Sequence, residues 1–179
     1  FFNRAMDVVK NVLKNQNTDV DTVSGATYSS KGLLGAIKNA LKQAEKAYNL
    51  GETPIGCVIV HEDKIIARGY NRRNTDKNPL AHAEVAAIRK ASKKLGDWRL
   101  EECTMYVTLE PCPMCAGAIL NARIPTVVYG AREAKSGSCG SVIDLFFENY
   151  GFQPRVYGGV RKNECAALLR NFFLRMRER

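Results

Sequence analysis

A short cysteine motif constrains this chain more than any other feature of its sequence. Cys112 and Cys115 are separated by two residues, and Pro111 and Pro113 flank the first of them. At the start of a helix this spacing puts both sulfurs on one face, about one turn apart. A helix N-terminus also favours the thiolate, which is the form that binds metal. The motif therefore predicts a metal site at the beginning of a helix.

A second motif supplies what a catalytic metal site needs. His82 lies near the start of a separate helix, expected from about Ala81 to Lys94, and its imidazole is a candidate third ligand. Three protein ligands leave a fourth position for water, which is the arrangement of a catalytic zinc site. Zinc lowers the pKa of that water toward about 7. Glu84 follows His82 by two residues and is placed to move protons rather than to bind metal.

The cysteine motif is also compatible with two functions other than catalytic zinc. A structural zinc site needs a fourth ligand, for which the candidates are His61, Cys103 and Cys139. A thioredoxin-like redox pair has no need of a His-x-Glu motif upstream. Because His82 and Glu84 precede the cysteines, the sequence favours the catalytic site.

Charge and length narrow the class of protein. The chain has 179 residues, of which 45% are hydrophobic, and this suffices for one hydrophobic core. The formal net charge of +9 favours a polyanionic partner, above all nucleic acid, over a basic enzyme with no such partner. Neither a run of eighteen apolar residues nor an export signal is visible, so we expect a cytoplasmic protein that spans no membrane and keeps its six cysteines reduced.

Hydrophobic periodicity predicts an α/β chain. A helix is expected over residues 31–48, capped by Ser29 or Ser30 and closed by Gly51, and a hairpin follows with strands 55–61 and 65–70. Beyond it strands and helices alternate, as they do in parallel α/β units. The further expected strands are 105–109, 126–129 and 156–157, and the further expected helices are 112–122, 142–147 and 163–177.

The order His-x-Glu and then Pro-Cys-x-x-Cys is the signature of zinc-dependent nucleobase deaminases. Longer strings resemble the TadA family of bacterial tRNA adenosine deaminases, from about residue 40 to the end of the chain. They are residues 54–56, 69–72, 81–84, 106–118, 130–132 and 164–169, together with Phe172 and Phe173. The resemblance implies a three-layer α/β/α cytidine deaminase-like fold with a mixed central sheet. It also implies a homodimer that converts the wobble adenosine (position 34) of a tRNA anticodon to inosine.

The resemblance also assigns roles to individual residues. It places the ligands of one zinc ion per subunit at His82, Cys112 and Cys115. It places the proton shuttle at Glu84 and the substrate contacts at Asn71, Ala83 and Glu133. Glu133 stands where the best-known members carry aspartate, which leaves its contact open. Asn71 also suits a turn that follows a strand.

Two alternative functions stay open at this point. A free-base or nucleoside deaminase such as guanine deaminase shares the Glu-Pro-Cys-Pro-Met-Cys string, but the C-terminal helix with its basic tail favours tRNA. A zinc-bearing RNA-binding module would have no use for the proton shuttle Glu84. Candidates for phosphate contacts, with a solvated helix face as the alternative for each, are Arg132, Lys135, Arg170, Arg175, Arg177 and Arg179.

The first part of the chain resembles a different family. Residues 21–30 read Asp-x-x-Ser-Gly-Ala-Thr-x-Ser-Ser and resemble the flavinylation motif of RnfG/NqrC-type FMN-binding domains, in which a threonine carries FMN through its phosphate. Thr27 is the matching position. The chain holds only the last part of such a domain, so we expect a remnant without flavin. We therefore divide the chain into a fragment at 1–38 and a deaminase domain at 39–179, with the helix at 31–48 serving both.

Overall fold

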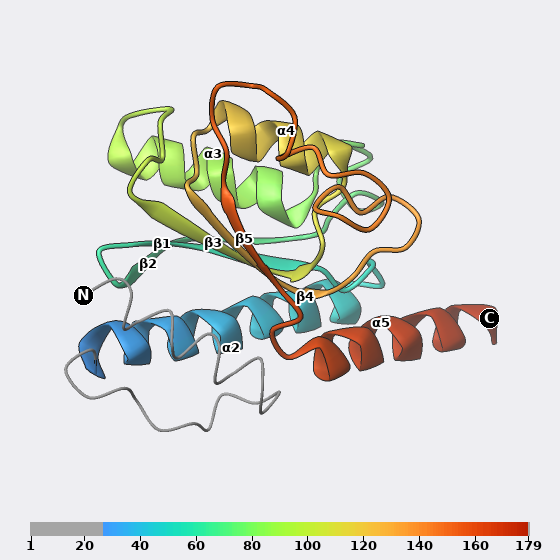
Figure 1. The fold of residues 1–179 in the computed structure, drawn as a ribbon. Helices are drawn as coiled ribbons and strands as arrows, with labels where there is room; N and C mark the ends of the chain where they lie inside the picture. Colours follow the sequence, from blue (N-terminus) through green and yellow to red (C-terminus); the bar gives the residue numbers. More distant parts are fainter. Residues whose placement is uncertain (1–26, 179) are drawn as a thin grey trace.

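The computed structural model describes residues 27–178, with side chains from residue 35 onward. These residues form a mixed five-stranded sheet in the order β2-β1-β3-β4-β5 (Figure 1). The strands are β1 (Gly56–His61), β2 (Lys64–Tyr70), β3 (Cys103–Leu109), β4 (Thr126–Ala131) and β5 (Arg155–Gly158). β1 is antiparallel to both β2 and β3, whereas β3, β4 and β5 run parallel to one another.

Helices cover both faces of the sheet. They are α2 (Thr27–Asn49), α3 (Ala83–Leu95), α4 (Pro113–Asn121) and α5 (Lys162–Arg177). α3 and α4 lie together on one face, and α2 and α5 lie on the other (Figure 1). The predicted three-layer α/β/α fold with a mixed sheet is confirmed. Within the described part of the chain, each helix is too short or too polar to cross a membrane.

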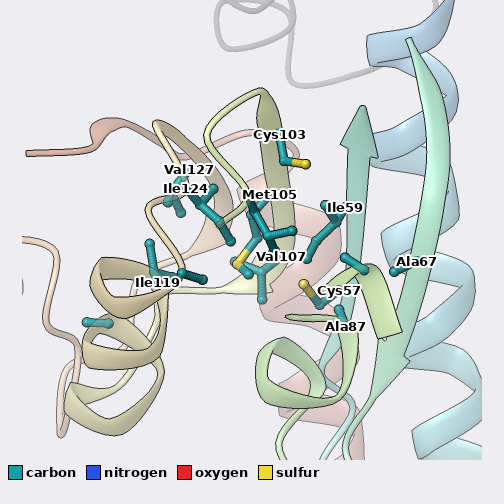
Figure 2. Close-up of a cluster of buried hydrophobic side chains, with 14 of the residues drawn as sticks. Cys57, Ile59, Ala67, Ala87, Cys103, Met105, Val107, Ile119, Ile124 and Val127 are labelled. Carbon is teal, nitrogen blue, oxygen red and sulfur yellow. The ribbon is translucent and has the colours of Figure 1, made fainter. Parts of the chain in front are cut away.

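The core lies on both faces of the three central strands. Because successive side chains of a strand point to opposite faces, Ile59, Met105 and Val127 pack under α3 and α4 (Figure 2), while Val58 and Val128 pack toward α2. β4 is buried along its whole length, as expected of a parallel strand covered on both sides. The sheet is therefore packed on both faces between two layers of helices.

Two glycines let the helices approach the sheet closely. A Cβ atom on Gly56 would lie 2.2 Å from the carbonyl oxygen of Ala40, so the backbone of α2 rests directly on β1. A Cβ atom on Gly69 would lie 2.0 Å from the carbonyl oxygen of Ala83, the first residue of α3. Any larger residue at either position would push a helix away from the sheet. Gly69 thus helps to set the position of the N-terminus of α3.

The C-terminal end of α2 was predicted correctly, but its N-terminal end was not. The helix begins before Ser29 and Ser30, so these serines lie inside it and do not cap it. Its C-terminal end follows the prediction, because Gly51 adopts the left-handed conformation with φ of 75°. The N–H group of Glu52 then donates to the carbonyl oxygen of Ala47 at 3.0 Å, which completes a Schellman motif.

The predicted short helix at 142–147 is wrong. The segment forms turns, pinned by an isolated antiparallel bridge between Cys139 and Asp144. The carboxylate of Asp144 accepts a hydrogen bond from the N–H of Phe146 at 3.2 Å, which favours a turn over a helix. Just before this segment, backbone donors bind the buried carboxylate of Glu110. Local side-chain acceptors have therefore outweighed the apolar pattern that suggested a helix.

Candidate active site

Three candidate metal ligands meet where two helices begin. His82 is the N-cap residue of α3, Cys112 is the N-cap residue of α4, and Cys115 lies in the first turn of α4. The Nδ1 atom of His82 lies 3.5 Å from Sγ of Cys115 and 3.7 Å from Sγ of Cys112. One donor atom from each residue falls within 4.8 Å of the other two. The structure therefore brings together residues that are 30 and 33 positions apart in the sequence.

The spacing of these donors fits a tetrahedral zinc ion. Zinc–nitrogen and zinc–sulfur bonds of ordinary length at a tetrahedral angle put nitrogen and sulfur about 3.6 Å apart. The observed distances of 3.5 and 3.7 Å bracket this value. One imidazole and two thiolates also form a donor set that suits zinc. The residues present thus fit the metal by both geometry and chemistry.

A closed four-ligand site does not form from the other candidates. Among residues 35–178, no further histidine, cysteine or acidic side chain joins the group of three donors. Nε2 of His61 instead lies 3.2 Å from a carboxylate oxygen of Glu102. Cys103 and Cys139 likewise stand outside the group. Three protein ligands leave one position for a small molecule, which favours a catalytic over a structural site.

Hydrogen bonding within the group shifts the pKa values of all three side chains. The pKa of Cys112 is lowered to about 4, mainly because the thiol of Cys115 donates a hydrogen bond to it and then because His82 does so. The hydrogen bond with Cys112 raises the pKa of His82. The same thiol–thiol hydrogen bond, together with burial, raises the pKa of Cys115. One cysteine is thus poised as a thiolate before any metal arrives.

Glu84 contributes a buried carboxylate beside the three donors. Its side chain is 4% exposed and lines the same pocket as His82 and Cys112. Burial raises the pKa of this carboxyl group. Among the buried side-chain oxygen and nitrogen atoms that the structure describes, Oε2 of Glu84 is the one without a hydrogen-bond partner. An unpartnered buried oxygen at this place is suited to bind a proton-bearing ligand such as water.

The pocket over this group has a volume of about 210 Å³. Two larger hollows, of about 520 and 690 Å³, lie elsewhere on the surface and contain none of the three metal-binding side chains. We place the site in the smaller pocket because chemistry, and not volume, identifies it. Its walls come from the segment after β2, the segment after β4 and the helix α5, with Asn71, Arg73, Arg132, Glu133, Ser136, Leu169 and Phe173 among the lining residues.

A buried glutamate that sequence analysis missed holds Asn71. The side-chain amide of Asn71 donates to Oε2 of Glu52 at 3.4 Å and to the carbonyl oxygen of Thr53 at 3.3 Å. Oε1 of Glu52 accepts from both the N–H and the hydroxyl group of Thr75. Burial opposes ionisation of Glu52, but the hydrogen bonds from Thr75 outweigh it and lower its pKa. The Asn71 side chain, which lines the pocket, is therefore held in place by hydrogen bonds to Glu52 and Thr53.

The other predicted site residues differ in how they meet the pocket. Glu133 is half-buried in the wall, where Oε1 accepts from the N–H of Lys135 at 2.9 Å. Ala83 is fully buried in the core under α3 and is not among the residues that line the pocket. Phe173, which belongs to the strings that resemble the TadA family, is half exposed and lines the pocket. Thr27 begins α2, and its side chain lies outside the described residues.

Two family models match the chain, and their matches overlap. The model of the MafB19-like deaminases matches residues 34–177, and the model of the FMN-binding domain matches residues 3–42. The overlap falls within α2 and agrees with the two resemblances seen in the sequence.

Two of the curated relatives are named as deaminases of tRNA. The chain is 46% identical over 144 residues to the tRNA-specific adenosine deaminase of Bacillus subtilis, covering 80% of this chain and 89% of that one. It is 45% identical to the chloroplastic tRNA(adenine(34)) deaminase of Arabidopsis thaliana, covering 76% of this chain but 12% of that longer protein.

Two solved structures with similar folds are also deaminases. One from a study of A-to-I editing by tRNA:A34 deaminases at the wobble position of transfer RNA has a TM-score of 0.73 and 41% identity. It covers 75% of this chain and 99% of that one. The guanine deaminase of Bacillus subtilis has a TM-score of 0.53 and 37% identity, covering 64% and 84% of the two chains.

The geometry predicts that metal content depends on the three donors. His82→Ala and Cys115→Ser should lose most of the bound metal, because each removes one of three protein ligands. Cys103→Ala, which changes a buried cysteine outside the group, should keep a full complement. Inductively coupled plasma mass spectrometry of the purified proteins measures the difference. Full occupancy in Cys115→Ser would remove Cys115 from the ligand set.

Proposed function

The chain belongs to the family of tRNA-specific adenosine deaminases, and we propose that it converts the wobble adenosine of a tRNA anticodon to inosine by zinc-dependent hydrolysis. One observation of the structure carries this proposal: the unpartnered carboxylate oxygen of Glu84 beside three convergent metal donors. A module that only bound RNA would gain nothing from burying such a group, which costs free energy unless it is used.

The residues of the site divide the chemical work. His82, Cys112 and Cys115 hold the zinc ion, which when bound lowers the pKa of a water molecule toward about 7. Glu84 would accept a proton from the attacking water as the water oxygen adds to C6 of the adenine, and would pass that proton to the ring nitrogen N1. Glu84 then takes the second proton from the hydroxyl group now on C6 and delivers it to the departing amino group. The bond from C6 to the exocyclic nitrogen breaks, ammonia leaves, and C6 carries the oxygen of inosine.

Asn71 and Glu133, which both line the pocket, position the nucleotide. The positive charge around the opening suits the phosphates of an anticodon loop, because Arg73 and Arg132 both line the pocket. Arg175 lies over the ring of Tyr48 at 5.6 Å, so part of its role is to pack α5 against α2. We also propose that the protein acts in the cytoplasm, because tRNA is its proposed substrate.

The direct test is deamination of a tRNA. Incubation with an arginine tRNA that bears an ACG anticodon, followed by sequencing of the wobble position, should show inosine. Glu84→Ala should keep its zinc but lose turnover by about a hundredfold or more, since general acid–base catalysis supplies at least that factor. Absence of inosine together with ammonia release from free guanine would identify a guanine deaminase instead. Full turnover by Glu84→Ala would remove Glu84 from its role.

We further propose that the protein is a homodimer. The turns after Cys139 expose four large apolar side chains on one short segment, and such clusters mark association surfaces. They are Val142, Ile143, Phe147 and Tyr150, with exposed fractions of 54, 47, 80 and 57%.

The dimer proposal predicts a mass of about twice 19.9 kDa in solution. Phe147→Asp should give a monomer, because it places a charge in the proposed apolar contact. Trp98→Asp, at an exposed aromatic residue that follows α3, is the matched control and should stay dimeric. Sedimentation equilibrium measures all three masses. A monomeric parent protein, or a dimeric Phe147→Asp variant, would contradict this assignment.

The division of the chain into a fragment at 1–38 and a deaminase domain at 39–179 is also proposed. The continuous helix α2 and the overlap of the two family matches support a shared helix across the boundary. We expect the fragment to carry no flavin. After coexpression with a flavin transferase, the intact mass should equal that of the polypeptide. An added FMN that disappears in Thr27→Ala would show that the fragment is a functional attachment site.

A further inference from the structure

A second buried glutamate lies next to the metal centre, and the chemistry described above does not use it. Glu110 follows the last residue of β3 and is separated from Cys112 by one proline. Its side chain is 2% exposed. Burying a carboxylate is costly unless it is well hydrogen-bonded. Its surroundings must therefore explain why an acidic residue stands at the end of a buried strand.

One loop supplies the hydrogen-bond donors. Oε2 of Glu110 accepts from the N–H of Glu133 at 3.1 Å and from the hydroxyl group of Ser141. Oε1 accepts from the N–H groups of Cys139 and Ser141 at 3.0 and 3.1 Å. All four donors lie in the segment 132–141, which we call the Glu110 loop. The loop thus surrounds the carboxylate of Glu110 with hydrogen-bond donors.

A glycine in the same loop gives independent support. A Cβ atom on Gly137 would lie 2.6 Å from both Cδ and Oε2 of Glu110 and 2.4 Å from the carbonyl oxygen of Glu133. These distances are too short for any side chain. The loop can approach the carboxylate only because this position is glycine.

The Glu110 loop is also a wall of the active-site pocket. Arg132, Glu133 and Ser136 line the pocket together with the metal ligands His82 and Cys112. The backbone that leads from β3 to Cys112 therefore also carries the carboxylate that binds the Glu110 loop. This side chain links the strand that leads to the candidate metal ligands with a loop that lines the pocket.

We propose that Glu110 is a positioning residue that locks the Glu110 loop in its substrate-binding place. This inference rests on the proposed function for its substrate, but the bracing of the loop does not. Without the carboxylate, the loop would lose the common acceptor of three backbone N–H groups and one hydroxyl group. Glu133 and Arg132 would then leave their positions while the metal ligands stayed in place.

The test compares Glu110→Gln with the parent protein loaded with zinc. Glutamine has nearly the same shape as glutamate, but an NH₂ group replaces one of the two carboxylate oxygens. Because this group cannot accept hydrogen bonds from the loop, the contacts of at least one oxygen are lost. The KM for a tRNA anticodon stem-loop should rise about tenfold to a hundredfold, as expected for losing charge-assisted hydrogen bonds that hold a binding wall. Zinc should remain at one ion per chain. Hydrogen exchange at the amides of Glu133, Cys139 and Ser141 should become faster.

A second variant tests the contact between Glu110 and the loop by changing a residue of the loop. Gly137→Ala should also raise KM and speed exchange, because its methyl group would displace the loop from Glu110. Val128→Ala is the matched control for simple loss of stability. It creates a small cavity on the α2 face of the sheet, away from the loop, and should lower the melting temperature while leaving KM and loop exchange unchanged.

The outcomes separate this inference from the proposed function. Unchanged KM and unchanged loop exchange in Glu110→Gln would overturn it, as would equal effects of Glu110→Gln and Val128→Ala on KM. If the parent protein does not deaminate the stem-loop, the proposed function fails. The exchange and zinc measurements would still decide whether Glu110 braces the loop.

Discussion

Two helix N-termini meet at one point of the sheet, and the rest of the site depends on that meeting. α3 follows the edge strand β2 and α4 follows the central strand β3, and both helices pack on the same face. Their first turns carry His82, Cys112 and Cys115, whose donor atoms must converge to bind one metal ion. Close contact between β2 and the start of α3, possible only because Gly69 has no side chain, fixes one half of this arrangement. The position of Cys112 directly after β3 fixes the other.

Three buried carboxylates show how the fold separates support from chemistry. Glu52 and Glu110 have their oxygen atoms engaged by hydrogen bonds from the loops that flank the pocket. Glu84 keeps one oxygen without a partner. A fully hydrogen-bonded buried carboxylate stabilises one conformation, whereas an unsatisfied one carries an energetic cost. We infer that the cost is retained at Glu84 because that oxygen must exchange protons with the substrate.

Sequence analysis predicted the layers, and it also predicted the three side chains whose donor atoms the structure brings together, for a simple physical reason. The signals were local: two residues between cysteines at a helix start, one between His82 and Glu84, and apolar runs that form buried strands. It failed at residues 142–147, where an apolar pattern suggested a helix but side-chain acceptors produced turns. Glu52 and Glu110 escaped notice because their partners lie 19 to 31 positions away. An acidic residue at the end of the apolar strand β3 was the one available hint of Glu110.

X-ray absorption spectroscopy at the zinc edge tests the central claim, that three protein donors leave a position for water beside Glu84. For the zinc-loaded protein we predict two sulfur ligands at about 2.3 Å, one nitrogen and one oxygen ligand at about 2.0 to 2.1 Å. The oxygen ligand should remain when Glu84 is changed to alanine, since it belongs to water and not to the carboxylate. A shell of three or four protein sulfur atoms, or the loss of the oxygen ligand in that variant, would contradict a catalytic site of this design.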